Sequence, residues 1–211
     1  MPQTYFDLYG WNTPNGQKVI IALEEVGAIY NYHPIDISKG EQHDSDFKAL
    51  SPDGKIPVLV SHTPEAVTHF ESGAILLHLA EHFPLLHGSS ASEKALVRAW
   101  TFWQVGQLGP LAGQFGYFSG KANADPETVA HFEQLVWRCL NVLEKRLADS
   151  PCIVGSRFTV ADIAALPWVA SQQSYLQKFN FPWRERCPAL QRWADAAMCK
   201  PSVIEAFQTV C

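Results

Sequence analysis

The stretch Tyr9-Gly10-Trp11-Asn12-Thr13-Pro14-Asn15-Gly16-Gln17-Lys18 decides how the first part of the chain folds. It follows a short apolar run at residues 4–9 and precedes a segment of helical period at residues 18–26. Pro14 suits the entry to a helix, because the N–H group that proline lacks has no helical partner at that position. The stretch therefore predicts a turn that connects an N-terminal strand to the first helix.

Thr13 and Asn15 offer this turn polar groups that can take part in chemistry. The first free N–H groups of a helix attract anions, and a thiolate or a carboxylate is such an anion. Thr13 and Asn15 place a hydroxyl and an amide beside those N–H groups. A well-capped turn without any chemistry fits the same residues, so the rest of the chain decides between the two interpretations.

The composition of the chain excludes several classes of protein. Its 211 residues are enough for one large domain or two small ones, and 47% hydrophobic residues can build a full core. The net charge of −5, with no basic stripe, argues against nucleic acid as a partner. The apolar runs are too short to span a membrane, and the N-terminus lacks the apolar core of a signal peptide. We therefore expect a soluble cytoplasmic protein without a membrane partner.

The cysteines and histidines point to neither a disulfide framework nor a metal site. The five cysteines are Cys139, Cys152, Cys187, Cys199 and Cys211. An odd number without C-x-x-C spacing argues against disulfides, a zinc site and a dithiol redox motif. His78, His82 and His87 lie close together, but no accompanying carboxylate pattern names a metal. We expect reduced thiols and no bound metal.

Residues 1–84 alternate strands and helices, which predicts an α/β domain. The expected strands are residues 4–9, 31–37, 55–60 and 67–70, and the expected helices are 18–26, 46–50 and 74–83. The first two strands are joined through a helix and should be parallel, whereas the last two should form a hairpin. The order is therefore βαβαββα.

The remainder of the chain predicts an all-α domain. Residues 85–91 change in composition and read as a linker, and residues 92–211 contain no convincing strand. Helices are expected at 92–107 and from Asp125 to Asp149. Another is expected to begin after Cys187-Pro188-Ala189 and to reach Lys200, and a short last one is expected at 202–208.

Two features inside this domain predict local structure. Glycines at 106, 109, 113 and 116 should let another backbone approach closely, and Pro110 should kink the helix there. Thr159 and Asp162 have the spacing of a buried capping box, which is a structural role.

Two more segments of the first domain offer groups to a ligand. Pro57 opens a strand, where it leaves the neighbouring backbone free to pair with an extended ligand. Glu71-Ser72 begins a helix, with Ser72 as the expected N-cap and an acidic side chain beside it. An edge-strand proline and ordinary helix capping are the structural alternatives.

Three motifs carry a resemblance to a known family. They are Thr13–Lys18, Phe70–Leu76 and Phe102–Pro110. Together with the proline before Val58 and the buried capping box, they resemble the glutathione S-transferase superfamily over essentially the whole chain. All three motifs look like those of the bacterial nu class of that superfamily, and the third is the most specific of them. The resemblance implies a thioredoxin-like glutathione-binding domain at 1–84, a helical substrate-binding and dimer domain at 92–211, and a homodimer.

The resemblance also implies a role for each candidate residue. Thr13 and Asn15 would lie beside the sulfur of reduced or oxidised glutathione. The rest of glutathione would be held by residues in four places: Gln42 and Lys55 at the glycine end, Ile56 before an expected cis Pro57 at the cysteinyl backbone, Glu71 at the γ-glutamyl ammonium, and Ser72 at the γ-glutamyl carboxylate.

The second-substrate pocket would lie in the helical domain. The aromatic region around Tyr117 is a candidate wall, with core packing as the alternative. His131 occupies the position where the resemblance leads us to expect a basic residue. A histidine there would bind a carboxylate less strongly than an arginine and would make the affinity pH-dependent, whereas a plain surface histidine is the alternative.

The implied activity is glutathione-dependent disulfide reduction, with glutathione as cosubstrate and a small-molecule disulfide as substrate. The turn contains no cysteine, so both reacting sulfurs would belong to glutathione and the substrate. Tyr9, at the end of the first strand, is a rival hydroxyl to Thr13. Two other functions remain open. One is a transferase or peroxidase that acts on small electrophiles, and the other is a glutathione-binding regulator or carrier without turnover.

Overall fold

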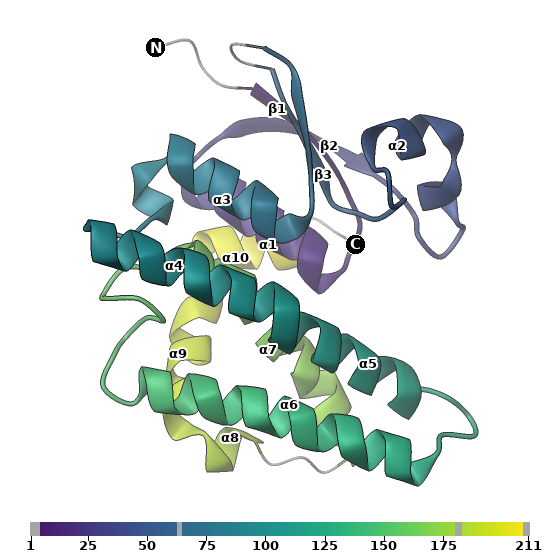
Figure 1. Ribbon diagram of the computed structural model, residues 1–211, viewed down its shortest axis with the longest axis vertical. Coiled ribbons are helices and arrows are strands. Elements are labelled where there is room, and N and C mark those ends of the chain that lie inside the picture. Colours follow the sequence, from purple (N-terminus) through teal and green to yellow (C-terminus); the bar gives the residue numbers. More distant parts are fainter. Residues whose placement is uncertain (1–4, 63–64, 180–182, 209–211) are drawn as a thin grey trace. The chain divides into compact units, whose positions relative to one another are not determined.

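The chain folds into two compact units. A computed structural model describes residues 5–62, 65–179 and 183–208. Unit 1 contains Met1–His87 and Cys199–Cys211, and unit 2 contains Gly88–Met198. Unit 1 combines a sheet with helices and unit 2 is mostly helical, which confirms the predicted fold class (Figure 1).

Unit 1 is built on a four-stranded mixed sheet. Its elements are β1 (Tyr5–Gly10), α1 (Pro14–Glu25), β2 (Ile29–Pro34), the 3-10 turn η1 (Glu41–His43), α2 (Ser45–Leu50), β3 (Val58–Ser61), β4 (Val67–Phe70), α3 (Ser72–His82), the 3-10 turn η2 (Pro84–Leu86) and α10 (Pro201–Gln208). The strand order is β2-β1-β3-β4. The β1–β2 pair is parallel because α1 connects the two strands, and the other two pairs are antiparallel. The parallel first pair and the final hairpin are as predicted.

Side-chain alternation along β1 separates the two faces of the sheet. Phe6 and Leu8 are completely buried, and the ring of Phe6 lies 6.5 Å from that of Phe83 at the end of α3. Asp7 and Tyr9 point to the opposite, partly exposed face. β2 starts and ends earlier than predicted, because its pairing with β1 ends at the Gly10–Pro34 pair.

The last helix corrects the predicted domain boundary. Residues 92–211 were expected to form the helical domain, but α10 packs against α1 in unit 1. Ser202 donates a hydrogen bond to Glu25 at 2.5 Å, and the Lys200 ammonium lies 2.9 Å from the same carboxylate. α10 also buries Val203 and Ala206. The buried apolar face of α10 and the contacts with Glu25 both hold this helix in unit 1.

Unit 2 consists of helices, one of which contains a break. Its elements are α4 (Ala91–Trp103), the π-helical turn η3 (Gln104–Leu108), α5 (Gly109–Ser119), α6 (Pro126–Leu147), α7 (Val160–Phe179), α8 (Trp183–Arg186) and α9 (Pro188–Met198). The kink expected at Pro110 is a whole turn of π-helix placed just before it. Pro110 has no N–H to donate to the preceding turn, which explains the change of winding.

Gly109 and Gly113 lie against a side chain rather than against a second backbone. A Cβ on Gly109 or Gly113 would stand 3.5 Å from the ring of Trp168 in α7, and one on Gly106 would meet nothing. At Gly109 and Gly113 the prediction of a close backbone approach was therefore wrong: the missing side chains make room for the indole and, at Gly109, for the Gln104 amide 2.9 Å away.

Asp162 closes the predicted capping box and extends it. Its carboxylate accepts hydrogen bonds from the backbone N–H groups of Thr159 at 3.0 Å and Ile153 at 2.8 Å. It also accepts one from the indole N–H of Trp193 at 2.9 Å. Burial raises the pKa of Asp162, although these hydrogen bonds oppose the shift. The residue holds a loop, α7 and α9 together, which is a structural role.

Candidate functional site

The N-terminus of α1 brings Thr13 and Asn15 to one place. Thr13 is the N-cap, and its hydroxyl oxygen accepts a hydrogen bond from the N–H of Gly16 at 3.2 Å. Asn15 follows Pro14 in the first turn of the helix. A Cβ on Gly16 would stand only 2.3 Å from the carbonyl oxygen of Trp11, so the turn closes this tightly only with glycine. The sequence motif is thus a sharp, capped helix start with a hydroxyl and an amide side chain in its first turn.

The rival residue Tyr9 has a different environment. Its ring stacks on that of His33 at 4.5 Å between centroids, on the face of the sheet that carries Asp7. Burial raises the pKa of the Tyr9 hydroxyl, and the charge of Asp7 adds to the shift. Asp7 itself accepts hydrogen bonds from His33 and His62, at 2.8 and 2.6 Å.

Gln42 and the turn before Lys55 lie side by side. A Cβ on Gly54 would stand 3.0 Å from the carbonyl oxygen of Gln42. The side-chain oxygen of Gln42 is buried and has no hydrogen-bond partner among the described residues. A buried acceptor without a donor is costly. Lys55 is exposed and pairs with Asp53 at 2.5 Å.

Ser51 fixes the turn that carries Lys55. Its buried hydroxyl donates to the carbonyl oxygen of Lys55 at 2.9 Å and accepts from the N–H of Lys55 at 3.1 Å. Replacing Ser51 with alanine should lower the free energy of unfolding by about 2 kcal/mol, because the N–H and the carbonyl group of Lys55 both lose a partly buried hydrogen bond. Urea denaturation measures this. Ser45→Ala is the control, since Ser45 is exposed in α2 and should change stability by less than about 0.5 kcal/mol. Equal effects of the two substitutions would contradict the assigned role of Ser51.

The Ile56–Pro57 peptide bond is cis, as the resemblance implied. The ladders that β3 forms with its two neighbours begin at Val58, so the backbone of Ile56 precedes them. This position leaves Ile56 at the end of the sheet, where an extended ligand could continue the pairing.

Glu71 and Ser72 open α3 in a way that differs from the prediction. The N-cap is Glu71, whose side chain makes no capping hydrogen bond, and Ser72 is the first residue of the helix. Glu71 has φ of 70° and ψ of 111°, a backbone conformation that residues with a side chain rarely adopt. Such conformations persist where the surrounding structure imposes them, and they are concentrated at binding sites. Ser72 is therefore not the cap, and its hydroxyl is left for another partner.

That partner is Lys18, which the sequence interpretation did not single out. Its ammonium group donates a hydrogen bond to the hydroxyl oxygen of Ser72 at 3.3 Å, and the residue is only 1% exposed. Burial lowers the pKa of Lys18 to about 7, against the opposing influence of the Glu71 carboxylate. The signal was present in the sequence: the five residues after Lys18 are all apolar, which predicts a helix buried on every side.

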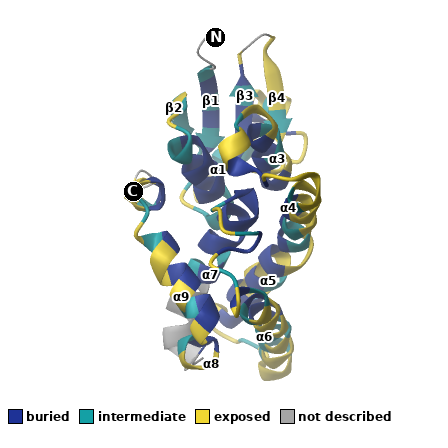
Figure 2. Cartoon of the chain, turned by 90° about the vertical axis from the view of Figure 1, so that its left-hand side faces the viewer, coloured by how far each residue is buried: buried dark blue, intermediate teal, exposed yellow. Residues whose placement is uncertain are grey.

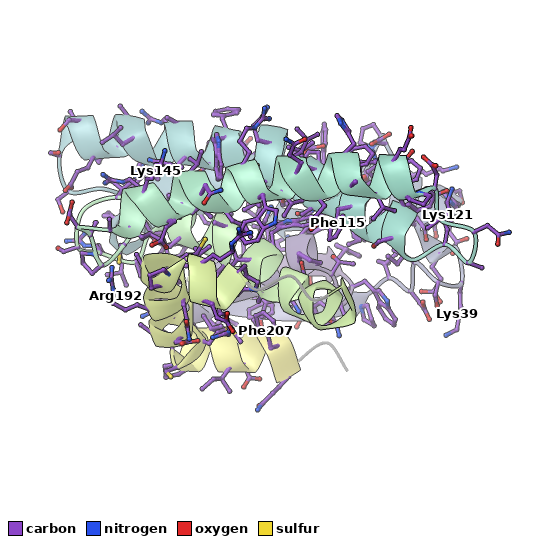
Figure 3. The ribbon with its side chains drawn as sticks, turned by 90° about the horizontal axis from the view of Figure 1, so that it is seen from below. Lys39, Phe115, Lys121, Lys145, Arg192 and Phe207 are labelled. Atoms are coloured by element: carbon purple, nitrogen blue, oxygen red, sulfur yellow. The ribbon has the colours of Figure 1, made fainter. Side chains whose placement is uncertain are left out.

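Tyr117 and His131 belong to an aromatic cluster in unit 2. The ring of Tyr117, which is 62% exposed, meets that of Phe118 edge-on at 5.2 Å. Phe118 stacks on Phe132 at 5.3 Å, and Phe132 contacts His131 at 5.4 Å. Lys121, labelled near the α5–α6 turn in Figure 3, places its ammonium 4.3 Å from the Tyr117 ring. The two predicted residues thus share one surface of aromatic and cationic groups.

The described part of the chain contains neither a candidate metal cluster nor a helix suited to a membrane. No group of three or more His, Cys, Asp or Glu side chains there could hold a metal ion. His78 instead stacks between His69 and His82, at 3.8 and 4.3 Å between ring centroids. No described helix is both long and apolar enough to cross a membrane.

Comparison with known proteins gives this geometry a context. The family model of the glutathione S-transferase N-terminal domain matches residues 2–81, and the family model of the C-terminal domain matches residues 126–196. The disulfide-bond oxidoreductase YfcG of Escherichia coli is 37% identical over 206 residues, which cover 95% of this chain and 94% of that protein.

Two solved structures resemble the whole chain. A glutathione transferase from Burkholderia graminis, with two glutathione molecules bound per subunit, has a TM-score of 0.92 and 31% identity. The match covers 99% of this chain and 89% of that one. A glutathione transferase from Pseudomonas putida, with one glutathione disulfide per subunit, has a TM-score of 0.91 and 30% identity, over 98% and 92% of the two chains.

Proposed function

This chain belongs to the glutathione S-transferase family, and we propose that it is a glutathione-dependent disulfide-bond reductase of the nu class. The observation that carries the proposal is the likeness, over nearly the whole of both chains, to a disulfide-bond oxidoreductase. A second observation agrees with it, since a structural relative holds glutathione disulfide, the oxidised product of such a reaction.

In the proposed binding mode, glutathione lies along unit 1, and a different group of this unit holds each of its parts. Glu71 pairs with the γ-glutamyl ammonium, and Ser72 with the first turn of α3 receives the γ-glutamyl carboxylate. The backbone of Ile56 pairs with the cysteinyl portion. Gln42 and the exposed ammonium group of Lys55 contact the glycine end. Every group of glutathione then meets a group of opposite charge or complementary hydrogen-bonding character.

Thr13 and Asn15 act on the sulfur in this proposal. A free cysteine thiol has a pKa of about 8.5, so little of it is thiolate at neutral pH. The N-terminus of α1, with the Thr13 hydroxyl and the Asn15 amide, stabilises the anion relative to the thiol. The pKa of bound glutathione falls, and the nucleophile is present at neutral pH.

The reaction consists of two thiol–disulfide exchanges. The bound glutathione thiolate attacks one sulfur of the substrate disulfide, forming a mixed disulfide and releasing the other sulfur as a thiolate that takes up a proton. A second glutathione thiolate then attacks the glutathione sulfur of the mixed disulfide. This step releases the second substrate thiol and glutathione disulfide, so two glutathiones supply the two electrons.

Two assays separate this function from its alternatives. With hydroxyethyl disulfide as substrate we expect glutathione-dependent reduction, and with chlorodinitrobenzene we expect slow conjugation. Fast conjugation without disulfide reduction would show a transferase or peroxidase instead. Tight glutathione binding with both assays blank would show a regulator or carrier.

The protein's own cysteines should be dispensable. Cys139, Cys152 and Cys187 are buried, and burial raises the pKa of Cys139 and Cys187, which disfavours their thiolates. A variant in which all five cysteines are alanine should keep kcat for hydroxyethyl disulfide within about threefold, since no protein thiol takes part. Circular dichroism checks its fold. A folded variant without disulfide reductase activity would show that a protein thiol reacts.

The proposal also covers the second substrate and the assembly. The Tyr117–His131 cluster is the proposed wall for the substrate disulfide or electrophile. A homodimer is proposed because β4, yellow in Figure 2, leaves Val67 and Phe70 each 46% exposed at the edge of the sheet. A cytoplasmic location agrees with the need for reduced glutathione.

A further inference from the structure

Lys18 lies directly behind the residue proposed to hold the γ-glutamyl carboxylate. It is 1% exposed, and its ammonium donates to the Ser72 hydroxyl oxygen at 3.3 Å. Burying an ammonium group is costly, and a lysine whose only purpose was packing would be replaced at less cost by an apolar side chain. A buried cation beside a ligand-binding helix start therefore calls for an explanation in terms of the ligand.

The direction of this hydrogen bond supplies the explanation. A serine hydroxyl both donates and accepts, and its hydrogen rotates to suit its surroundings. An ammonium group can only donate, so Lys18 occupies an acceptor position on the Ser72 oxygen. The Ser72 hydrogen must then point elsewhere, and donation to a carboxylate strengthens each bond of such a chain.

We propose that Lys18 is a positioning residue for the γ-glutamyl carboxylate: it orients the Ser72 hydroxyl as a donor and supplies a positive charge behind it. This role rests on the function proposed above. Ser72 touches the ligand and Lys18 acts through it. The pair would make the site selective for a γ-glutamyl group with a free carboxylate over one whose carboxylate is blocked.

The charges around Lys18 agree with this role. Within unit 1, α1 packs against α3 and α10. α3 brings the Ser72 hydroxyl, and Glu71 just before it raises the pKa of Lys18, whereas burial lowers it to about 7. α10 meets the far end of α1, where Ser202 and Lys200 contact Glu25. A ligand carboxylate would add negative charge at α3 and favour the ammonium form.

A ligand comparison tests the proposal. The probes are reduced glutathione and an analogue whose γ-glutamyl α-carboxylate is a carboxamide, and calorimetry gives the Kd of each. The parent protein should prefer glutathione, and Lys18→Met should reduce that preference about tenfold by weakening glutathione binding alone. Lys18→Gln, which keeps a donor but not the charge, should lose less. Ser72→Ala should add little to Lys18→Met, because both act on one hydrogen-bond chain.

The control and the outcomes separate this role from others. Lys145→Met removes an exposed lysine of α6, labelled in Figure 3, and should leave the preference unchanged. An unchanged preference in folded Lys18→Met would overturn the role of Lys18 while leaving the proposed function intact. If the parent protein binds neither probe, the proposed function fails, and the role of Lys18 fails with it.

The stability of Lys18→Met without ligand gives an independent readout: the substitution should weaken glutathione binding but raise the Tm. Burial lowers the pKa of Lys18 to about 7 in the folded protein, whereas a lysine in the unfolded chain has a pKa of about 10.5. Between these values the unfolded chain binds more protons, so the contribution of Lys18 to stability rises with pH. Without ligand, Lys18→Met should therefore raise the Tm at neutral pH by about 3 °C, and the gain should shrink as the pH approaches 10. A lower Tm at neutral pH would indicate a purely structural lysine.

Discussion

Replacing Asn15 with alanine should lower kcat for glutathione-dependent disulfide reduction about 100-fold, while Kd for glutathione changes by less than about threefold. Asn15 lies in the first turn of α1, where a donor to the glutathione sulfur would act on the thiolate and on the charge that forms during exchange. The rest of glutathione would be held by residues outside this turn, so the substitution should spare affinity. Steady-state kinetics with hydroxyethyl disulfide and calorimetry with glutathione measure the two quantities.

A direct measurement of the thiolate makes this prediction sharper. The ultraviolet absorbance of the thiolate, followed against pH in the complex, gives the pKa of bound glutathione, which should be higher in Asn15→Ala than in the parent. Thr13→Ser is the matched control: it keeps a hydroxyl at the N-cap of α1, so both kcat and the pKa should stay near the parent values. If Asn15→Ala leaves kcat intact, the sulfur does not depend on this turn.

The parts of the molecule that local chemistry determines were predictable from the sequence. The order of elements along unit 1, the parallel first pair and the final hairpin followed from the period of the apolar residues and from the length of each connection. The helix entry at Pro14 and the buried box at Asp162 followed from short motifs that act within a few residues, whereas the helix itself begins four residues earlier than the predicted residue 18.

The errors concern features that depend on distant partners. α10 joins unit 1 because Glu25 offers it a polar partner, and no property of residues 201–208 alone predicts this contact. Gly109 and Gly113 of α5 looked suited to a backbone, yet Trp168 fills the space beside them. The backbone of Glu71 takes a positive φ that glutamate does not favour by itself, so the cap was assigned to Ser72. For α10 and for the glycines, a contact with a residue distant in sequence decided the outcome.

Glu71 was nevertheless singled out correctly as a charge beside a helix start, and its unusual backbone makes it the best test of the binding site. Glu71→Gln should weaken glutathione binding about 30-fold, because a charge-assisted hydrogen bond to the γ-glutamyl ammonium contributes about 2 kcal/mol. The value of kcat at saturating glutathione should change little, since the ammonium takes no part in the exchange. Calorimetry and saturation kinetics measure these two effects.

A pair of variants separates the charge of Glu71 from its backbone strain. Glu71→Ala and Glu71→Gly both remove the carboxylate and should weaken glutathione binding by the same factor. Glycine accepts a φ of 70° without a steric penalty, so Glu71→Gly should be more stable than Glu71→Ala by about 1 kcal/mol in urea denaturation. A glutathione analogue without the γ-glutamyl amino group should bind all three proteins alike. If Glu71→Gly restores affinity, the backbone conformation rather than the carboxylate recognises the ligand.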